Sequence, residues 1–344
     1  MPKPIQDAVI LAGGFGTRLR PLTAKTPKPL LSVGGRPFLE TLFFRLAQGG
    51  AKRAVLSVFH QTTVLKAALP KLRRFGLRVE LRKEPKPLGT GGAIRFAWPD
   101  PQKPVLVLNG DVLSDYDLRH FQRAHAAAKA SASVWVIPVE DPSAFGVLEF
   151  SADGRVRRFV EKPRPGESDS RHINAGLYAL GPEVWRGIAA GRPVSVERET
   201  FPGLLAQGQR LQAVRAPGAV YWNDIGTPAS YLKAHVDILN HRLWKGLGPA
   251  KKLWGSLDKR GSLRHGSKVA ASALVSQSVL GLGCSVGAGA RIEASVLLDG
   301  VQVGEGAQLQ GVIIGPGSRI GARVQVRPGA VLAPGTVLPD DSKA

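Results

Sequence analysis

The stretch from Asp7 to Leu19, Asp-Ala-Val-Ile-Leu-Ala-Gly-Gly-Phe-Gly-Thr-Arg-Leu, decides how the amino-terminal half of the chain folds. Its first six residues form a short apolar run that ends in glycines, which is typical of a buried strand. The glycines at positions 13, 14 and 16 lack side chains and let successive backbone N–H groups approach phosphate oxygens. The sequence therefore predicts a strand followed by a phosphate-binding loop.

Two cations follow this loop closely. Arg18 can bind a pair of phosphate oxygens as a fork, whereas Lys28 can act as a point charge. Pro27 and Pro29 flank Lys28 and restrict its backbone. A tight turn in an ordinary doubly wound fold would explain the glycines alone, but it does not account for the cations.

The run from Gly13 to Pro29 resembles the signature of the sugar-nucleotide pyrophosphorylases, GGxGxRLxPLTxxxPKP, at every fixed position. The resemblance implies a nucleotidyltransferase domain that binds a nucleoside triphosphate here and at the loop Pro87-Leu-Gly-Thr-Gly-Gly. The implied nucleotide-binding residues are Leu11, Ala12, Gly13, Gly14, Gly16, Thr17, Gly89 and Thr90. The implied catalytic residues are Arg18, Lys28 and Asp111.

Strands and helices alternate over residues 1 to about 130, which predicts a mostly parallel sheet with helices on both faces. We expect a doubly wound, Rossmann-like α/β domain over residues 1–240. Ligands of such sheets bind at the carboxyl ends of the strands, so the glycine loop, the Gly89 turn and Asn109-Gly-Asp111 should share one edge. Strands dominate from 133 to 180, and a helix is expected over 195–206.

The carboxyl-terminal part of the chain has a different composition. Residues 241–268 are basic and rich in glycine, and we expect a solvated linker. From 269 to 344, aliphatic residues recur about every six positions, as at Val286, Ile292 and Val303, with glycine after several of them. This hexapeptide period predicts a parallel β-helix, and the resemblance to families with this domain implies left-handed coils.

Two aspartates far apart in the sequence are candidate metal ligands. Asp111 follows a buried strand, and Asp224 lies in Tyr221-Trp-Asn-Asp-Ile-Gly-Thr. Either could instead be a turn residue or a helix cap, as we expect for Asp115 and Asp117. Both segments resemble metal-binding motifs of the pyrophosphorylases. The resemblance implies that Asp111 and Asp224 together bind Mg²⁺, which prefers carboxylates, water and phosphate oxygens.

A further set of residues resembles the sugar-phosphate site of the same family. Phe159-Val-Glu-Lys implies that Glu161 accepts hydrogen bonds from sugar hydroxyls and that Lys162 neutralises the sugar 1-phosphate. An exposed ion pair at a strand end is the alternative for these two. Asn174-Ala-Gly resembles the next sugar-contacting segment, and Gly146 resembles a glycine at which the backbone meets the sugar. The implied sugar-phosphate residues are Gly146, Glu161, Lys162, Asn174 and Gly176.

The reaction implied is in-line attack of a sugar 1-phosphate oxygen on the α-phosphorus of a nucleoside triphosphate, which expels pyrophosphate. Four motifs together resemble the mannose-1-phosphate guanylyltransferases most: Pro87-Leu-Gly-Thr-Gly-Gly, Asp141-Pro-Ser-Ala-Phe-Gly, Ser195-Val-Glu-Arg-Glu-Thr-Phe-Pro and Trp222-Asn-Asp-Ile-Gly-Thr-Pro. The resemblance therefore makes GTP and mannose 1-phosphate the favoured substrates. Heptose-1-phosphate guanylyltransferases and glucose-1-phosphate uridylyl- or thymidylyltransferases are alternatives. So is a catalytically silent regulatory subunit that binds sugar nucleotides.

Composition limits what else the chain could do. The net charge of +21 suits anionic substrates and would also attract nucleic acid nonspecifically, but no recognised reader motif accompanies it. The single cysteine, Cys284, excludes an internal disulfide and should be a small buried residue. No apolar run approaches membrane-spanning length, so we expect a cytoplasmic protein. We also expect a homo-oligomer assembled through the β-helix.

Overall fold

The structure is a computed structural model that describes residues 3–240 and 251–344. The chain divides into two compact units. The first contains residues 1–14 and 42–222, and the second contains residues 15–41 and 223–344. The expected linker falls partly outside the described residues, at 241–250.

The first unit contains a nine-stranded sheet, in the order β10-β9-β11-β6-β1-β4-β5, with β8 paired to β11 and to β12. Strands β6, β1, β4 and β5 are parallel, and β11 lies antiparallel to β6. The strands of this sheet are β1 (Asp7–Leu11), β4 (Arg53–Val58), β5 (Arg78–Lys83), β6 (Val105–Asn109), β8 (Ala132–Pro138), β9 (Gly146–Phe150), β10 (Val156–Glu161), β11 (His172–Leu180) and β12 (Leu211–Arg215).

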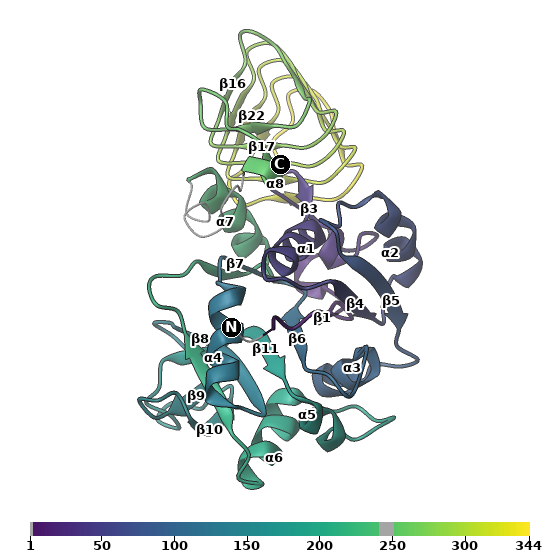
Figure 1. The fold of residues 1–344 in the computed structure, drawn as a ribbon. Helices are drawn as coiled ribbons and strands as arrows, with labels where there is room; N and C mark the ends of the chain where they lie inside the picture. The colour runs from purple at the N-terminus through teal and green to yellow at the C-terminus, as the bar shows by residue number, and fades with distance from the viewer. Residues whose placement is uncertain (1–2, 241–250) are drawn as a thin grey trace. The chain divides into compact units, whose positions relative to one another are not determined.

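The helices of this unit follow the expected alternation in its first half (Figure 1). Asp117 caps α4 by accepting hydrogen bonds from the backbone N–H groups of Arg119 and His120, as expected of a residue at a helix N-terminus. The helices are α2 (Thr62–Ala68), α3 (Gly89–Ala97), α4 (Leu118–Ala128), α5 (Pro182–Gly187) and α6 (Phe201–Ala206). The expected helix over 195–206 begins with a π-helical turn, η4 (Val196–Thr200), before α6.

The centre of the sheet is the apolar core of the first unit. β1 pairs with β4 and β6, and Val9 lies opposite Val55 on one side and Val107 on the other. All three side chains are fully buried, and Ile94 of α3 belongs to the same cluster. Burying one such side chain contributes about 1.5–3 kcal/mol, so this core fixes where the carboxyl end of β1 lies.

In the second unit, residues 15–41 include two short 3-10 turns, η1 (Thr17–Leu19) and η2 (Lys28–Leu30), and a hairpin of β2 (Ser32–Val33) and β3 (Arg36–Pro37). The helix α7 (Pro228–Leu239) begins at Thr227, whose side chain forms a capping box with Ser230. Other elements of the chain are α1 (Phe38–Gln48), β7 (Val112–Ser114), β13 (Trp222–Asp224), α8 (Lys251–Trp254) and the 3-10 turn η3 (Leu69–Lys71).

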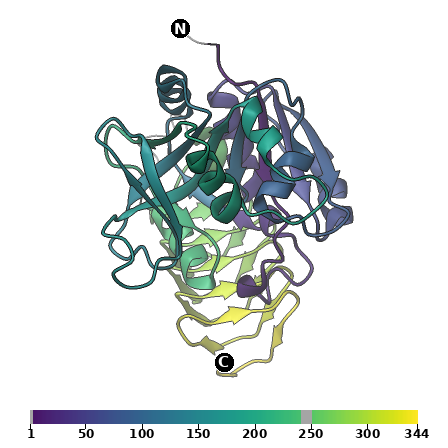
Figure 2. The ribbon, with the colours of Figure 1, turned by 90° about the horizontal axis from the view of Figure 1, so that it is seen from below.

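From Leu263 onward this unit is a parallel β-helix, as the hexapeptide pattern predicted, and it is left-handed, as the family resemblance implied. Three parallel sheets contain the strand orders β14-β17-β20-β23-β26, β15-β18-β21-β24-β27 and β16-β19-β22-β25. Figure 2 shows these strands stacked in successive coils. The strands are β14 (Leu263–Arg264), β15 (Lys268–Val269), β16 (Leu274–Ser276), β17 (Val279–Leu280), β18 (Ser285–Val286), β19 (Arg291–Glu293), β20 (Val296–Leu297), β21 (Gln302–Val303), β22 (Gln308–Gln310), β23 (Ile313–Ile314), β24 (Arg319–Ile320), β25 (Gln325–Val326), β26 (Val331–Leu332) and β27 (Val337–Leu338).

The hexapeptide aliphatics stack on one another inside the β-helix. Val286 pairs in register with Val303, and Val303 with Ile320, so one column of branched side chains forms the inner wall of a sheet. Cys284 is 1% exposed within this core, as its small apolar neighbours led us to expect. The first coil begins with β14, which lies inside the segment expected to be linker. This strand pairs in parallel with β17, although the six-residue pattern is not yet clear in its sequence.

Candidate active site

The glycine loop leaves β1 at the carboxyl end of the parallel strands. Gly110, just after β6, donates its N–H to the carbonyl oxygen of Leu11 at 2.9 Å. A Cβ at Gly110 would lie 2.3 Å from that oxygen, so only glycine allows this approach. Leu11, Ala12, Gly13, Gly14 and Asp111 therefore lie around two adjacent strand ends of one sheet, as expected.

A buried carboxylate that the sequence analysis did not single out lies under this loop. Glu84 is 4% exposed, and its Oε1 accepts a hydrogen bond from the Ser57 hydroxyl at 2.9 Å. Its Oε2 accepts from the backbone N–H of Leu88 at 3.1 Å, at the start of the expected base loop. A Cβ on Gly13 would come within 3.1 Å of Oε1. Glu84 thus holds the start of the base loop by a hydrogen bond and lies close to the glycine loop at Gly13.

The base loop is held on its other side by residues 194–197. Gly89 has a φ of +67°, and a Cβ there would lie 2.6 Å from the carbonyl oxygen of Val194. The N–H of Gly91 donates to the same oxygen at 2.8 Å. Thr90 donates its hydroxyl to Glu197 at 2.7 Å. The loop backbone is therefore fixed in a conformation that glycine at position 89 allows.

The predicted sugar residues lie on the antiparallel strands of the same unit. Gly146 pairs with Glu161 across β9 and β10, and a Cβ on Gly146 would lie 2.7 Å from Glu161 Oε2. Burial, and then the charge of Glu197, raise the pKa of Glu161 above its ordinary value. Lys162 follows with a φ of +54°, and its side chain is exposed. The glycine therefore leaves the Glu161 carboxylate accessible beside the backbone of β9.

Asn174 and Gly176 lie where the pairing of β11 with β8 shifts register, an irregularity common beside functional sites. Asn174 Oδ1 accepts from the N–H of Gly176 at 3.0 Å. Gly176 has a φ of +76°, and a Cβ there would lie 2.8 Å from Asn109 Nδ2. The sugar segment thus adjoins the end of β6, two residues before Asp111.

The second unit brings together three of the predicted residues. Asp224 lies between two cations: Oδ1 is 3.8 Å from Lys28 Nζ, and Oδ2 is 3.9 Å from an Arg18 guanidinium nitrogen. A Cβ at Gly226 would lie 2.8 Å from Arg18 and 2.9 Å from Asp224, so glycine leaves room for this pair. Lys28 has only 11% of its side chain exposed, whereas Arg18 has 67%.

The loop that carries Arg18 is shaped locally. Gly16 has a φ of +62° at the start of η1, and Thr23 donates its hydroxyl to the Gly16 carbonyl at 2.7 Å. Thr17 is the first residue of η1. These contacts fix the turn from which Arg18 extends, with Lys28 in the 3-10 turn that follows.

The hairpin after Lys28 is packed against the later part of the chain. His235 and Tyr231 of α7 both contact the Ser32 carbonyl, through Nε2 at 3.1 Å and through the phenol hydroxyl. Trp254 donates its indole N–H to Val33 at 3.1 Å, and His265 Nε2 lies 2.8 Å from the Gly34 carbonyl. The end of the expected linker therefore supports the segment that positions Lys28.

Asp111 belongs to the first unit and Asp224 to the second, so their shared binding of a metal ion stays a prediction. Among the described residues, no three histidine, cysteine or acidic side chains form a metal cluster. A pair of carboxylates is a donor set that suits Mg²⁺ when phosphate oxygens complete the coordination. Asp115 instead accepts from the Tyr221 N–H at 2.7 Å and is a structural turn residue.

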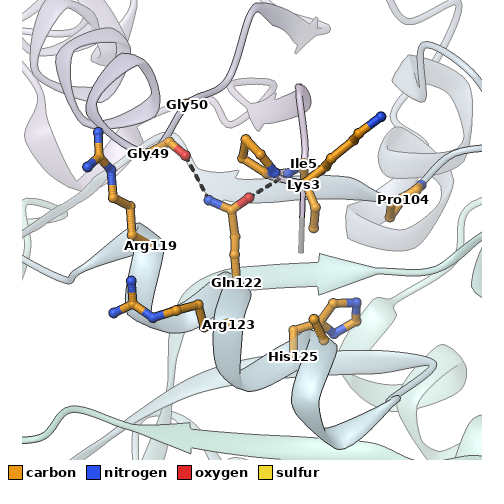
Figure 3. Close-up of a pocket in the computed structure, with 11 residues that line it drawn as sticks. Lys3, Ile5, Gly49, Gly50, Pro104, Arg119, Gln122, Arg123 and His125 are labelled. Carbon is orange, nitrogen blue, oxygen red and sulfur yellow. Dashed lines mark hydrogen bonds between the residues drawn. The ribbon is translucent and has the colours of Figure 1, made fainter. Parts of the chain in front are cut away.

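The first unit also contains a cavity of about 650 Å³ (Figure 3). Pro4, Gly50 and Pro104 line it, and each precedes a parallel strand, so the cavity is at the amino-terminal edge of the sheet. Gln122 joins two of its walls by accepting from the N–H of Ile5 and donating to Gly49 (Figure 3). None of the predicted site residues lines this cavity.

Comparison with known proteins gives two family matches. The nucleotidyl transferase family matches residues 7–241, and the GMPPB C-terminal domain matches residues 261–341.

No helix among the described residues has the length and apolar character needed to cross a membrane.

Individual relatives agree with these matches. A mannose-1-phosphate guanylyltransferase of Mycobacterium tuberculosis is 38% identical over 279 residues, which cover 80% of this chain and 75% of the relative. A mannose-1-phosphate guanylyltransferase catalytic subunit beta of Danio rerio is 38% identical over 65% of this chain, and the match spans 62% of that relative. The crystal structure of HddC from Yersinia pseudotuberculosis is 29% identical, with a TM-score of 0.56 over 66% of this chain and 97% of that chain. HddC complexed with GMP-PN has a TM-score of 0.55 at the same identity and coverage.

Proposed function

The chain belongs to the nucleotidyl transferase family, and we propose that it transfers GMP from GTP to mannose 1-phosphate, giving GDP-mannose and pyrophosphate. The observation that carries the proposal is the grouping of Arg18, Lys28 and Asp224 within one unit. A site that joins two anions needs such fixed cations. The names of the relatives at 38% identity favour guanylyl transfer to mannose 1-phosphate over the heptose, uridylyl and thymidylyl alternatives.

In the reaction, an oxygen of the sugar 1-phosphate attacks the α-phosphorus of GTP, and the bond from that phosphorus to the bridging oxygen breaks, so pyrophosphate leaves. The attacking phosphate is already anionic, so no covalent enzyme intermediate is required. The protein's contribution is positioning and charge neutralisation. Lys28 and Arg18 stabilise the negative charge that grows on the α-phosphoryl and pyrophosphate oxygens. Lys162 reduces the repulsion between the two anionic substrates.

The remaining site residues orient the substrates. The glycine loop and the segment at Gly89–Thr90 bind the nucleotide through backbone N–H groups, and Glu161 accepts hydrogen bonds from sugar hydroxyls. Members of the family use a divalent metal ion. We propose Mg²⁺, bound by Asp111 and Asp224, which would supply Lewis-acid neutralisation of the α-phosphate.

The proposal also covers the cellular location of the enzyme and its binding partners. The cytoplasm, which supplies nucleoside triphosphates, is the expected location. A homo-oligomer assembled through the β-helix fits its exposed apolar side chains, Leu274, Leu282 and Val337, which are 45%, 56% and 67% exposed. We propose no nucleic-acid function, because the surplus of basic residues accompanies no recognised reader motif.

The test is pyrophosphate release by the purified protein with GTP, mannose 1-phosphate and Mg²⁺. We expect release that requires both substrates, and that is reduced with ATP, UTP or dTTP and with other sugar 1-phosphates. Binding of GDP-mannose without any turnover would instead indicate the silent regulatory subunit. Turnover with a different pair of substrates would keep the family assignment and refute the proposed specificity.

A further inference from the structure

Glu197 is a half-buried carboxylate that the proposed mechanism does not use. It lies in the π-helical turn η4, and single π-turns occur frequently at functional sites. Its Oε2 accepts hydrogen bonds from the hydroxyls of Thr90 at 2.7 Å and Ser195 at 2.9 Å. The N–H of Val196 donates to the Thr90 hydroxyl at 2.8 Å. Both hydrogen-bonding roles of the Thr90 hydroxyl are thus filled by one turn, which fixes its orientation.

The other oxygen of Glu197 faces the sugar segment. Oε1 lies 3.5 Å from the hydroxyl of Tyr178, a fully buried residue of β11. The same hydroxyl accepts from Asn174 Nδ2 at 2.8 Å, and Asn174 Oδ1 accepts from the N–H of Gly176. Burial, and then the charge of Glu197, raise the pKa of Tyr178 well above its ordinary value, so the phenol keeps its proton and directs it toward the carboxylate.

We propose that Glu197 is a positioning residue that couples the nucleotide loop at Thr90 to the sugar segment at Asn174, through Tyr178. The inference rests on the proposed function, because it assigns nucleotide and sugar phosphate to these two segments. One carboxylate then contacts both walls of the site, so that moving one wall displaces the other. The α-phosphorus and the attacking oxygen must be held in line, and this coupling would fix their alignment.

Electrostatics provides a second connection between Glu197 and the sugar side. The pKa of Glu161 is raised by burial and by Glu197, and it is lowered by Lys162 and Arg198. Tyr178 also feels the charge of both carboxylates. Removing the charge of Glu197 should lower the pKa of Glu161. The acidic limb of the pH profile for sugar-phosphate use should then move to lower pH.

The test compares kcat/KM of Thr90→Val, Tyr178→Phe and the double variant, in the native chain and in Glu197→Ala. The side chains of Thr90 and Tyr178 are joined here through Glu197, so we expect their effects to be non-additive by more than about threefold in the native chain. In Glu197→Ala the effects should become additive. Glu197→Ala itself should lower kcat/KM about 10- to 100-fold, because charged hydrogen bonds are lost on both sides.

Glu199→Gln is the matched control, since Glu199 lies in the same turn but is exposed and pairs with Arg192. It should leave the coupling between Thr90 and Tyr178 and the acidic limb unchanged. Glu197→Gln serves if Glu197→Ala does not fold, as checked by circular dichroism. Additive effects in the native chain, or an unchanged acidic limb in the Glu197 variants, would overturn the inference. Absence of any turnover in the native protein would refute the proposed function instead.

Discussion

Acid should destabilise this protein through one histidine of α7, close to the segment that positions Lys28. His235 is 1% exposed, and its two ring nitrogens face the carbonyl oxygens of Tyr231 at 2.9 Å and Ser32 at 3.1 Å. Those carbonyls favour the charged ring, but burial outweighs them and lowers the pKa of His235 from 6.5 to about 4. The ring is therefore neutral in the folded protein at neutral pH.

The sign and size of the effect follow from linkage. Between pH 6.5 and about 4 the unfolded chain binds a proton at His235 that the folded chain does not, so the free energy of unfolding falls as the pH falls. At about 1.4 kcal/mol per pH unit, this site should remove about 3 kcal/mol of stability across that window. Below about pH 4 both states bind the proton, and the contribution stays constant.

Urea denaturation at a series of pH values measures this directly. We expect the stability of the native protein to fall by about 3 kcal/mol more than that of His235→Gln between pH 6.5 and 4. The exposed His60→Gln is the control and should follow the native protein. Parallel curves for the native protein and His235→Gln would refute the argument that burial keeps this ring neutral.

Three other predictions concern the site. Lys28→Ala should reduce kcat about 100-fold, because the charge that stabilises the transition state is lost. The control Lys25→Ala should leave kcat unchanged. Equal losses of kcat in the two variants would show that Lys28 has no special role. Gly110→Ala should destabilise the fold by about 1–3 kcal/mol in urea, because its Cβ would lie 2.3 Å from the Leu11 carbonyl; an unchanged midpoint would contradict the close approach. Glu84→Ala should cost about 3 kcal/mol of stability and raise the KM for GTP, and a KM effect alone would show that the carboxylate is not structural.

Local patterns predicted much of this fold. The apolar run at Asp7–Leu11 forms a central strand, because its residues can be buried on both faces of a parallel sheet. The six-residue period after Val269 predicted the β-helix, since each aliphatic residue stacks on the one a coil away. Asp117 caps a helix as its position suggested. In each case the determining contacts are local, or they repeat at a fixed spacing.

The long-range contacts of the fold could not be predicted from local sequence patterns. Residues 15–41 group with 223–344, because Ser32, Val33 and Gly34 contact side chains more than 190 positions later. Nothing in the pattern of residues 15–41 indicates those partners. The antiparallel strand β11 lies between β6 and β9 for a similar reason, since strand order depends on tertiary packing.

In the candidate site, too, local patterns predicted some residues, whereas only tertiary contacts reveal the role of others. The residues predicted to contact phosphates lie in a recognised motif, and Glu197 lies in Ser195-Val-Glu-Arg-Glu-Thr-Phe-Pro, one of the segments that carry the family resemblance, whereas Glu84 lies in no such segment. A buried acid resembles a surface acid in a sequence, and only its neighbours reveal its role. Glu84 lies just before the base loop, and this proximity is the one signal that could have drawn attention to it.

The proposed mechanism requires a divalent ion that Asp111 and Asp224 bind together. The direct measurement is Mn²⁺ binding by electron paramagnetic resonance with a non-hydrolysable GTP analogue, for the native protein, Asp111→Asn, Asp224→Asn and the double variant. We expect each single variant to lose the bound ion, and the double variant to be no worse, as two ligands of one ion require. Native affinity in either single variant would contradict the shared site.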